Sequence, residues 1–117
     1  MTLHTGGCHC GATRFEVDID TEKPVMCNCS RCRKLGWAMG FTPRTSFKLI
    51  AEGPLTEYLF NKEVIRHQFC TLCGIESFAY AAAPDGAATV AVNLNCLDGI
   101  DAHALALKAH VYDGASI

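Results

Sequence analysis

Three tight clusters of cysteine constrain this chain more than any other feature of its sequence. The central cluster reads Cys27-Asn28-Cys29-Ser30-Arg31-Cys32, and it is flanked by Cys8-His9-Cys10 upstream and by Cys70-Thr71-Leu72-Cys73 downstream. Seven of the eight cysteines lie in these clusters. Thiolates at such short spacings are typical ligands of zinc, which they hold at about 2.3 Å in a tetrahedral arrangement. The clusters therefore predict one set of four thiolate ligands and a second set of three.

The setting of these cysteines favours metal over disulfides. The 117 residues are expected to form a single zinc-binding domain over 1–117, since a chain of this length gains from a bound metal. Its N-terminus shows no basic segment followed by an apolar run, so no secretory signal is predicted. We therefore expect a cytoplasmic protein, in which thiols stay reduced and are available to metals.

Charge and hydropathy exclude two classes of partner. The formal net charge is −2, whereas a general nucleic-acid binder usually presents a basic face. No apolar stretch approaches the ~20 residues that a membrane-spanning helix needs. We expect neither a nucleic acid nor a membrane as partner, and the oligomeric state is not predicted.

Short runs of alternating apolar and polar residues predict an all-β or β-rich fold of antiparallel strands with little helix. Glycines around Cys8 and Cys10 predict a hairpin with a metal knuckle at its tip. One helical turn is expected over 30–35, closed by Gly36, and a short helix over 102–107. Strands are expected over 3–5, 12–19, 37–42, 46–51, 56–60, 64–70, 77–81, 89–93 and 110–112, with turns between them that include Asn61-Lys62.

The downstream cluster predicts a structural metal site. Cys70 and Cys73, followed by Gly74, form a knuckle that supplies two of the four ligands such a site needs. The other two come from Cys8 and Cys10 or from the central cluster; we favour Cys8 and Cys10 because this choice leaves the central thiols as a separate set. Metal binding of this kind contributes on the order of 10 kcal/mol to folding. A redox pair of the thioredoxin type is the alternative, but no βαβ pattern surrounds the knuckle.

The central cluster predicts a catalytic metal site. An ion held by Cys27, Cys29 and Cys32 alone keeps a fourth position free, as catalytic zinc does. Three thiolates weaken its Lewis acidity, so a sulfur ligand suits it better than a hydroxide. Three alternatives stay open: Cys96 completes a second closed site, the thiols bridge two ions, or they hold an iron–sulfur cluster. A lone cysteine such as Cys96 in an apolar context is more often a buried small side chain.

The sequence resembles the glutathione-dependent formaldehyde-activating enzyme family in the order of its cysteine motifs, which is C-x-C, then C-x-C-x-x-C, then C-x-x-C-G. Two aromatic residues, Phe69 and Phe78, lie near the last motif. The family includes the centromere-protein-V-like domains. The resemblance runs from about Gly6 to Gly114. It implies a β-rich fold of the Mss-four-like type and two zinc ions per chain. The structural ion would lie on Cys8, Cys10, Cys70 and Cys73, and the catalytic ion on Cys27, Cys29 and Cys32.

The resemblance also implies a substrate and a reaction. The family adds glutathione to formaldehyde to give S-hydroxymethylglutathione, a carbon–sulfur lyase reaction in reverse. Arg31, Arg33 and Lys34 follow the central cluster and are expected either to pair with the two glutathione carboxylates or to be solvated surface charges. The alternative functions are a non-catalytic carrier of glutathione or another thiol, and a purely structural zinc domain that mediates protein contacts.

Three further side chains near these motifs are expected to be structural. His67 lies in a predicted strand, where a paired histidine is more common than a catalytic base. Trp37 and Phe41 follow the central cluster and would either wall its pocket or pack in the core, which is usual for aromatic residues in strands.

Overall fold

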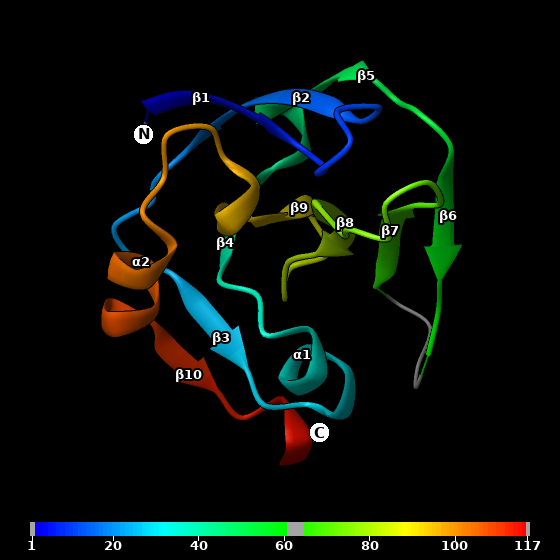
Figure 1. Ribbon diagram of the computed structural model, residues 1–117. Helices are drawn as coiled ribbons and strands as arrows, with labels where there is room; N and C mark the ends of the chain where they lie inside the picture. Colours follow the sequence, from blue (N-terminus) through cyan, green and yellow to red (C-terminus); the bar gives the residue numbers. More distant parts are fainter. Residues whose placement is uncertain (1, 61–64, 117) are drawn as a thin grey trace.

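The protein folds into two β-sheets that pack on each other, with two short helices at their margins (Figure 1). The structure, a computed structural model, describes residues 2–60 and 65–116. Within these residues the smaller sheet has three strands in the order β1-β2-β5. They are β1 (Thr2–Gly7), β2 (Arg14–Ile19) and β5 (Phe47–Ala51). The β-rich fold predicted from the sequence is confirmed.

The larger sheet has seven strands within the same residues, in the order β10-β3-β4-β9-β8-β7-β6. Their pairing is antiparallel throughout, except that β10 runs parallel to β3. The strands are β3 (Val25–Cys27), β4 (Met39–Pro43), β6 (Leu55–Tyr58), β7 (Arg66–Cys70), β8 (Phe78–Ala82), β9 (Ala88–Asn93) and β10 (His110–Tyr112).

The main core lies between the two sheets. Alternation along β2 turns Phe15, Val17 and Ile19 inward, where each is 0–1% exposed. They belong to one apolar cluster with Val90 and Val92, the inward residues of β9. Because β2 reads polar-apolar-polar, its register is fixed: a shift by one residue would bring Glu16 into this core.

The opposite face of the larger sheet carries a second, smaller core that includes metal-ligand candidates. The inward side chains of β8 and β9 on this face are Ala79 and Ala91, which leave space above the strands. Trp37 fills that space together with Cys32, and it is only 2% exposed. The central cysteine cluster therefore sits directly on the sheet.

Both expected helices are present, and each has a defined start. Helix α1 (Ser30–Leu35) begins after Cys29, whose sulfur accepts a hydrogen bond from the Cys32 N–H, and it ends at Gly36 in the left-handed conformation with φ of 70°. Helix α2 (Ala102–Lys108) begins after Asp101, whose carboxylate accepts from two backbone N–H groups. In the described part of the chain, 3-10 turns cover Arg44–Ser46, Leu94–Cys96 and Gly114–Ser116.

The structure corrects the expected boundaries at several strands. No strand was expected over Val25–Cys27, where β3 lies between β10 and β4. The strand expected over 56–60 is β6, which ends at Tyr58, and the strand expected from 64 is β7, which begins at Arg66. Val64 and the turn expected at Asn61-Lys62 lie outside the described residues.

Among the described residues no helix combines the length and the apolar character that crossing a membrane requires.

Candidate metal centres and substrate groove

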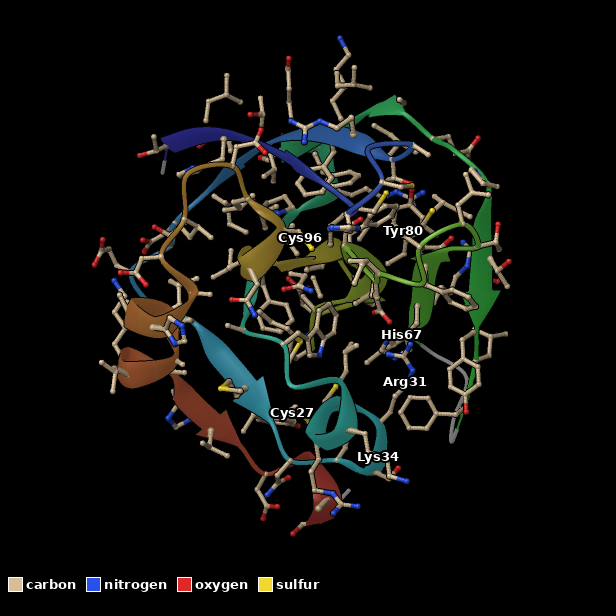
Figure 2. All side chains as sticks on the ribbon, in the orientation of Figure 1. Cys27, Arg31, Lys34, His67, Tyr80 and Cys96 are labelled. Atoms are coloured by element: carbon tan, nitrogen blue, oxygen red, sulfur yellow. The ribbon has the colours of Figure 1, made fainter. Side chains whose placement is uncertain are left out.

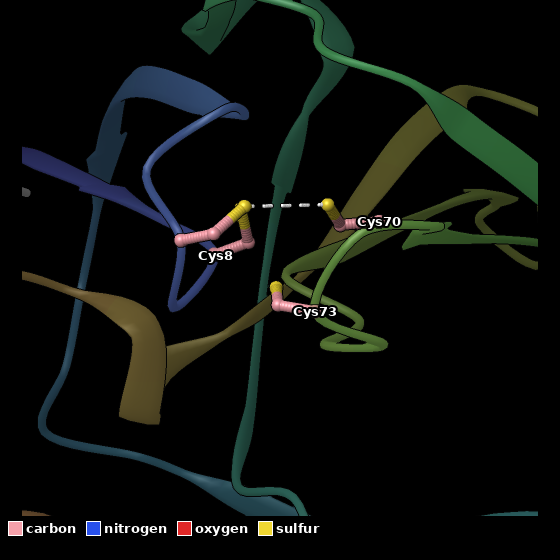
Figure 3. Close-up of side chains that lie close together, drawn as sticks. Cys8, Cys70 and Cys73 are labelled. Carbon is pink, nitrogen blue, oxygen red and sulfur yellow. Dashed lines mark hydrogen bonds between the residues drawn. The ribbon is translucent and has the colours of Figure 1, made fainter.

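Four thiols from distant parts of the chain meet at one edge of the two sheets. Cys8 and Cys10 lie in the turn that joins β1 to β2, Cys70 ends β7, and Cys73 lies in the turn that follows β7. Figure 3 shows these two turns facing each other, with their sulfur atoms directed into the space between them. The structure thus brings together the four residues that the sequence assigned to a closed site.

The geometry of this four-cysteine group fits a metal ion. Sγ of Cys10 lies 3.6 Å from Sγ of Cys8 and 3.6 Å from Sγ of Cys70, and all four sulfurs lie within 4.8 Å of one another. Tetrahedral metal–sulfur bonds of about 2.3 Å place neighbouring sulfurs about 3.8 Å apart, whereas a disulfide brings them to about 2.05 Å. All eight cysteines, each within the described part of the chain, are free thiols.

The backbone around this group favours thiolates. Burial opposes ionisation of Cys8, but the N–H of Thr13, 3.4 Å from its sulfur, and the neighbouring thiols outweigh burial and lower the pKa to about 6. The N–H of Ile75 lowers the pKa of Cys73. For Cys10 the Ala12 N–H acts in the same direction, yet burial and the adjacent sulfurs prevail and raise the pKa to about 11. Sulfurs this close resist joint ionisation unless a cation lies between them.

The turn at Cys70–Gly74 is shaped by its backbone. The N–H of Gly74 donates to the Cys70 carbonyl at 2.7 Å, and the N–H of Cys70 donates to the Ile75 carbonyl at 3.0 Å. Gly74 has φ of 79°, a conformation that is strained for other residues. The C-x-x-C-G motif therefore forms the tight knuckle that its sequence predicted.

The three central thiols form a second group at the start of α1. Cys27 ends β3, Cys29 caps the helix and Cys32 lies in its first turn, and their sulfurs also lie within 4.8 Å of one another. Backbone N–H groups approach two of these sulfurs at 3.4 Å: that of Cys29 approaches Cys27, and that of Cys32 approaches Cys29. The donor set, three sulfurs on one tight turn, fits a soft metal ion with a free fourth position.

The three thiols differ in their readiness to ionise. Burial raises the pKa of Cys32 to about 12, although the Trp37 indole acts to lower it. Burial also raises the pKa of Cys27. At Cys29 burial is outweighed by the N–H and thiol of Cys32 and by the N–H of Arg31, so its pKa is lowered. The backbone at the start of α1 therefore favours the thiolate form of Cys29.

Cys96 belongs to neither group of thiols. It ends the 3-10 turn after β9, and Figure 2 shows it well apart from Cys27. Burial raises its pKa to about 12, and the charges of Cys8 and Cys73 add to this effect. The alternative in which Cys96 completes a second closed site with the central thiols is therefore wrong: its polypeptide segment packs beside the four-cysteine group instead.

The segment after β10 covers one side of the central thiols. Tyr112 pairs with Cys27, and its carbonyl accepts from the Asn28 N–H at 3.1 Å. The Asn28 side chain donates to Asp113 at 3.1 Å and accepts from the Ala115 N–H at 2.9 Å. Figure 1 shows this segment, red, beside α1. Its position narrows the approach to the central thiols.

An open groove leads from the central thiols along α1. A hollow of about 340 Å³ beside Cys29 adjoins a larger one of about 500 Å³, since both are bounded by Ser30, Arg33 and Phe60. The hollow beside Cys29 is completed by Asn28, Gly114 and Ala115, and the larger one by Arg31, Lys34, Tyr58 and Phe69. The groove therefore joins a thiol group to a wall that is cationic on one side and aromatic on the other.

The three basic residues expected to bind substrate have different surroundings. Arg33 and Lys34 lie in the last turn of α1 and line the groove. Arg31 lines it as well, but its guanidinium forms an ion pair with Glu76 at 2.5 Å and lies over the Tyr58 ring at 5.1 Å. Because its charge is already matched by Glu76, Arg31 has less to offer a substrate carboxylate than Arg33 and Lys34.

Sequence reasoning missed the aromatic wall and the carboxylate. Tyr58 and Phe69 lie on β6 and β7, and no local signal connected them with the central cluster. Glu76 follows a glycine turn, where an exposed charge is usual, yet it is buried. Trp37 packs in the core and Phe41 is 50% exposed, and neither lines the groove. His67 is buried and paired, as expected of a strand histidine.

The fold and its thiol groups define a class of protein: a β-rich domain with one enclosed set of four cysteines and one set of three beside a groove. The family model of the glutathione-dependent formaldehyde-activating enzymes matches residues 3–115. The chain belongs to that family. A solved structure of a Rhodobacter sphaeroides protein is similar over 92% of this chain and 99% of that one, with 26% sequence identity and a TM-score of 0.82. Membership indicates a glutathione-dependent formaldehyde-activating or related role.

Proposed function

We propose that this protein binds two zinc ions and catalyses the reversible addition of glutathione to formaldehyde, giving S-hydroxymethylglutathione. In this proposal Cys8, Cys10, Cys70 and Cys73 hold a structural ion. The three central thiols, Cys27, Cys29 and Cys32, hold the catalytic ion. The observation that carries the proposal is that the three-thiol group borders a groove lined by Arg33 and Lys34, while the four-thiol group closes on itself.

The reaction needs a thiol sulfur and an aldehyde carbon in contact. The sulfur–carbon bond forms as the carbonyl electron pair moves to oxygen, and that oxygen takes the proton that the thiol gives up. When bound, zinc with a free position supplies a Lewis acid that lowers the pKa of a thiol or polarises a carbonyl oxygen. The protein side chains then have to bind and orient the tripeptide.

The groove provides groups for this orientation. Arg33 and Lys34 project from the last turn of α1 and offer two cations for the two glutathione carboxylates. The rings of Tyr58 and Phe60 stand opposite and exclude water from one side of the peptide. The hollow beside Cys29 is the end at which the substrate sulfur would enter.

Turnover and binding can be measured separately. With glutathione and formaldehyde, we expect the purified zinc protein to form S-hydroxymethylglutathione faster than the spontaneous reaction, followed by NMR. Arg33→Met and Lys34→Met should raise KM for glutathione more than they lower kcat, because they remove contacts present before and during reaction. Lys108→Met, at an exposed site on α2, is the matched control. Glutathione binding by calorimetry with no rate above background would make the protein a carrier instead.

A further inference from the structure

A buried ion network lies between the two thiol groups and has no place in the proposed chemistry. Glu76 and His67 have side chains that are 1% and 2% exposed. One carboxylate oxygen of Glu76 lies 2.5 Å from Nη2 of Arg31, and the other lies 2.7 Å from Nδ1 of His67. Nδ1 of His67 also lies 3.1 Å from Nη1 of Arg31, and the shorter contact, to the Glu76 carboxylate, is the one in which Nδ1–H donates. Figure 2 shows Arg31 and His67 side by side above α1.

Burying the Glu76 carboxylate costs free energy unless both Arg31 and His67 are present to interact with it. A carboxylate removed from water loses its hydration, and only a well-placed cation and hydrogen-bond donors compensate for that loss. Removing one partner leaves a buried charge without compensation, so the network fixes the distance between the segments that carry Arg31 and Glu76. Those segments are α1 and the residues just after the Cys70–Cys73 knuckle.

Helix α1 depends on such an anchor. It has six residues, and a helix of that length is not stable alone in water. Arg31 lies between Cys29 and Cys32 in sequence, so the contact with Glu76 holds the turn that positions both sulfurs. The packing of Cys32 on Trp37 and the Asn28 contacts to the segment after β10 also attach this turn.

Glu76 in turn depends on the four-thiol group. It lies three residues after Cys73, and the intervening backbone is tied into the knuckle through the Cys70 N–H and the Ile75 carbonyl. The Glu76 carbonyl accepts from the side-chain amide of Asn93 at 2.9 Å. An ion that draws Cys70 and Cys73 toward Cys8 and Cys10 therefore also fixes the backbone from which the Glu76 carboxylate reaches Arg31.

We propose that the Arg31–Glu76–His67 network couples the two metal centres, so that filling the four-cysteine group raises the metal affinity of the three-cysteine group. Glu76 is then a positioning residue that acts on the catalytic ion through Arg31. The inference rests on the two-metal part of the proposed function but not on its reaction. A protein whose two metal affinities are coupled but which shows no turnover would overturn only the proposed reaction. A protein that turns over but whose two metal affinities are independent would overturn only the proposed coupling.

The first test is Glu76→Gln, which keeps the shape of the side chain and removes its charge. Zinc binding is measured by competition with a chromophoric chelator, and native mass spectrometry counts the ions bound. We expect the three-cysteine ion to be withdrawn roughly tenfold more readily, within the usual range of coupling between sites, while the other ion, weakened by the same factor, stays bound to its four thiolates. Alkylation of the exposed thiols followed by peptide mass spectrometry identifies which group has lost its ion.

A control separates this effect from general destabilisation. Thr42→Val removes another buried hydrogen bond, from the Thr42 hydroxyl to the Asp18 carbonyl at 2.8 Å, on β4 and away from α1. It should lower the unfolding free energy without changing zinc affinity. Should Glu76→Gln not fold, Arg31→Lys keeps a cation but loses the planar fork, and it should weaken the same ion.

The decisive test is reciprocity, because coupling must act equally in both directions. Cys29→Ser removes a ligand of the three-cysteine group. It should lower the zinc affinity of the four-cysteine group by the same factor by which Glu76→Gln lowers the zinc affinity of the three-cysteine group. In the Glu76→Gln background, Cys29→Ser should have no further effect on the four-cysteine ion. Unchanged affinity of both ions in Glu76→Gln, or a Cys29→Ser effect on the four-cysteine ion that persists without Glu76, would each overturn the proposal.

Discussion

Gly114 lies against Cys27 so closely that a Cβ atom at position 114 would overlap the Cys27 sulfur. The same atom would stand 3.3 Å from Cβ of Cys29. The two residues are far apart in sequence and meet because β10 pairs with β3 in parallel, Tyr112 beside Cys27. Gly114 also borders the hollow beside Cys29, so the size of residue 114 limits the space around the central thiols.

Gly114→Val should therefore impair the central metal centre while the fold persists. Its side chain has to displace either the Cys27 sulfur or the segment after β10, and both changes disturb a ligand position. We expect the variant to hold one zinc ion instead of two, with far-UV circular dichroism unchanged. Ala88→Val adds similar bulk at an exposed position on β9 and should hold two ions. Two tightly bound ions in Gly114→Val would show that residue 114 does not confine the site.

Asn28→Ala should release the segment that Gly114 belongs to. The Asn28 side chain makes two hydrogen bonds to it, one to the Asp113 carboxylate and one from the Ala115 N–H. Their loss should lower the unfolding free energy by about 1–2 kcal/mol, measured by urea denaturation of the zinc-loaded protein. The Ala115 amide should exchange with deuterium faster than in the wild type. Unchanged exchange at Ala115 would mean that strand pairing alone holds the segment.

The thiol groups were predictable because a metal-binding knuckle is a local feature. Cys70 and Cys73 share one turn, and Gly74 supplies the backbone conformation that the turn requires, so spacing alone predicted two ligands on one face. Choosing Cys8 and Cys10 as their partners needed only a count of the remaining thiols. The two groups of sulfurs that spacing predicted are the groups that the structure brings together.

The rest of the site was not predictable because it arises from contacts between distant segments. Val25–Cys27 is too short to show a period, and it forms a strand because β4 and β10 pair with it on either side. Phe69 reaches the groove through the order of strands in the larger sheet. Nothing near Glu76 in the sequence marks it as buried; its partner Arg31 lies on another element and was expected to bind substrate instead.

Cys70→Ser and Cys29→Ser should have unequal consequences for folding. Loss of a ligand at the four-cysteine group removes most of a metal contribution on the order of 10 kcal/mol, which is comparable to the whole stability of a small domain. Cys70→Ser should therefore unfold or precipitate. Cys29→Ser keeps a good helix-capping side chain before α1, so it should stay folded with one zinc ion fewer.

Metal content by mass spectrometry, together with circular dichroism, checks this division between the two centres. Cys96→Ser is the matched control, because Cys96 belongs to neither group and its loss should leave both ions bound. Equal loss of fold in Cys70→Ser and Cys29→Ser would contradict the assignment of one structural and one catalytic ion.

The ion pair between Arg14 and Asp98 should make a pH-dependent contribution to stability. The two side chains approach at 2.5 Å and 3.2 Å, and Thr5 donates to the same carboxylate at 2.7 Å. Hydrogen bonds from Arg14 and Thr5 lower the pKa of Asp98 to about 2, from an ordinary value of 3.8. A carboxylate with a lowered pKa in the folded state stabilises the protein above its unfolded pKa, and this contribution is lost as the pH falls toward the folded value.

Asp98→Asn should therefore be less stable than the wild type by a constant amount from pH 7 down to about pH 5, and the difference should shrink from about pH 4 downward. Urea denaturation of both proteins at each pH measures this difference in unfolding free energy. The thiolate centres destabilise both proteins equally in acid, so their effect cancels in the difference. Glu22→Gln, which removes an exposed ion pair to Lys108, is the control and should change stability little. A wild-type advantage that grew as the pH fell through 4 would have the wrong sign for a carboxylate that Arg14 keeps ionised.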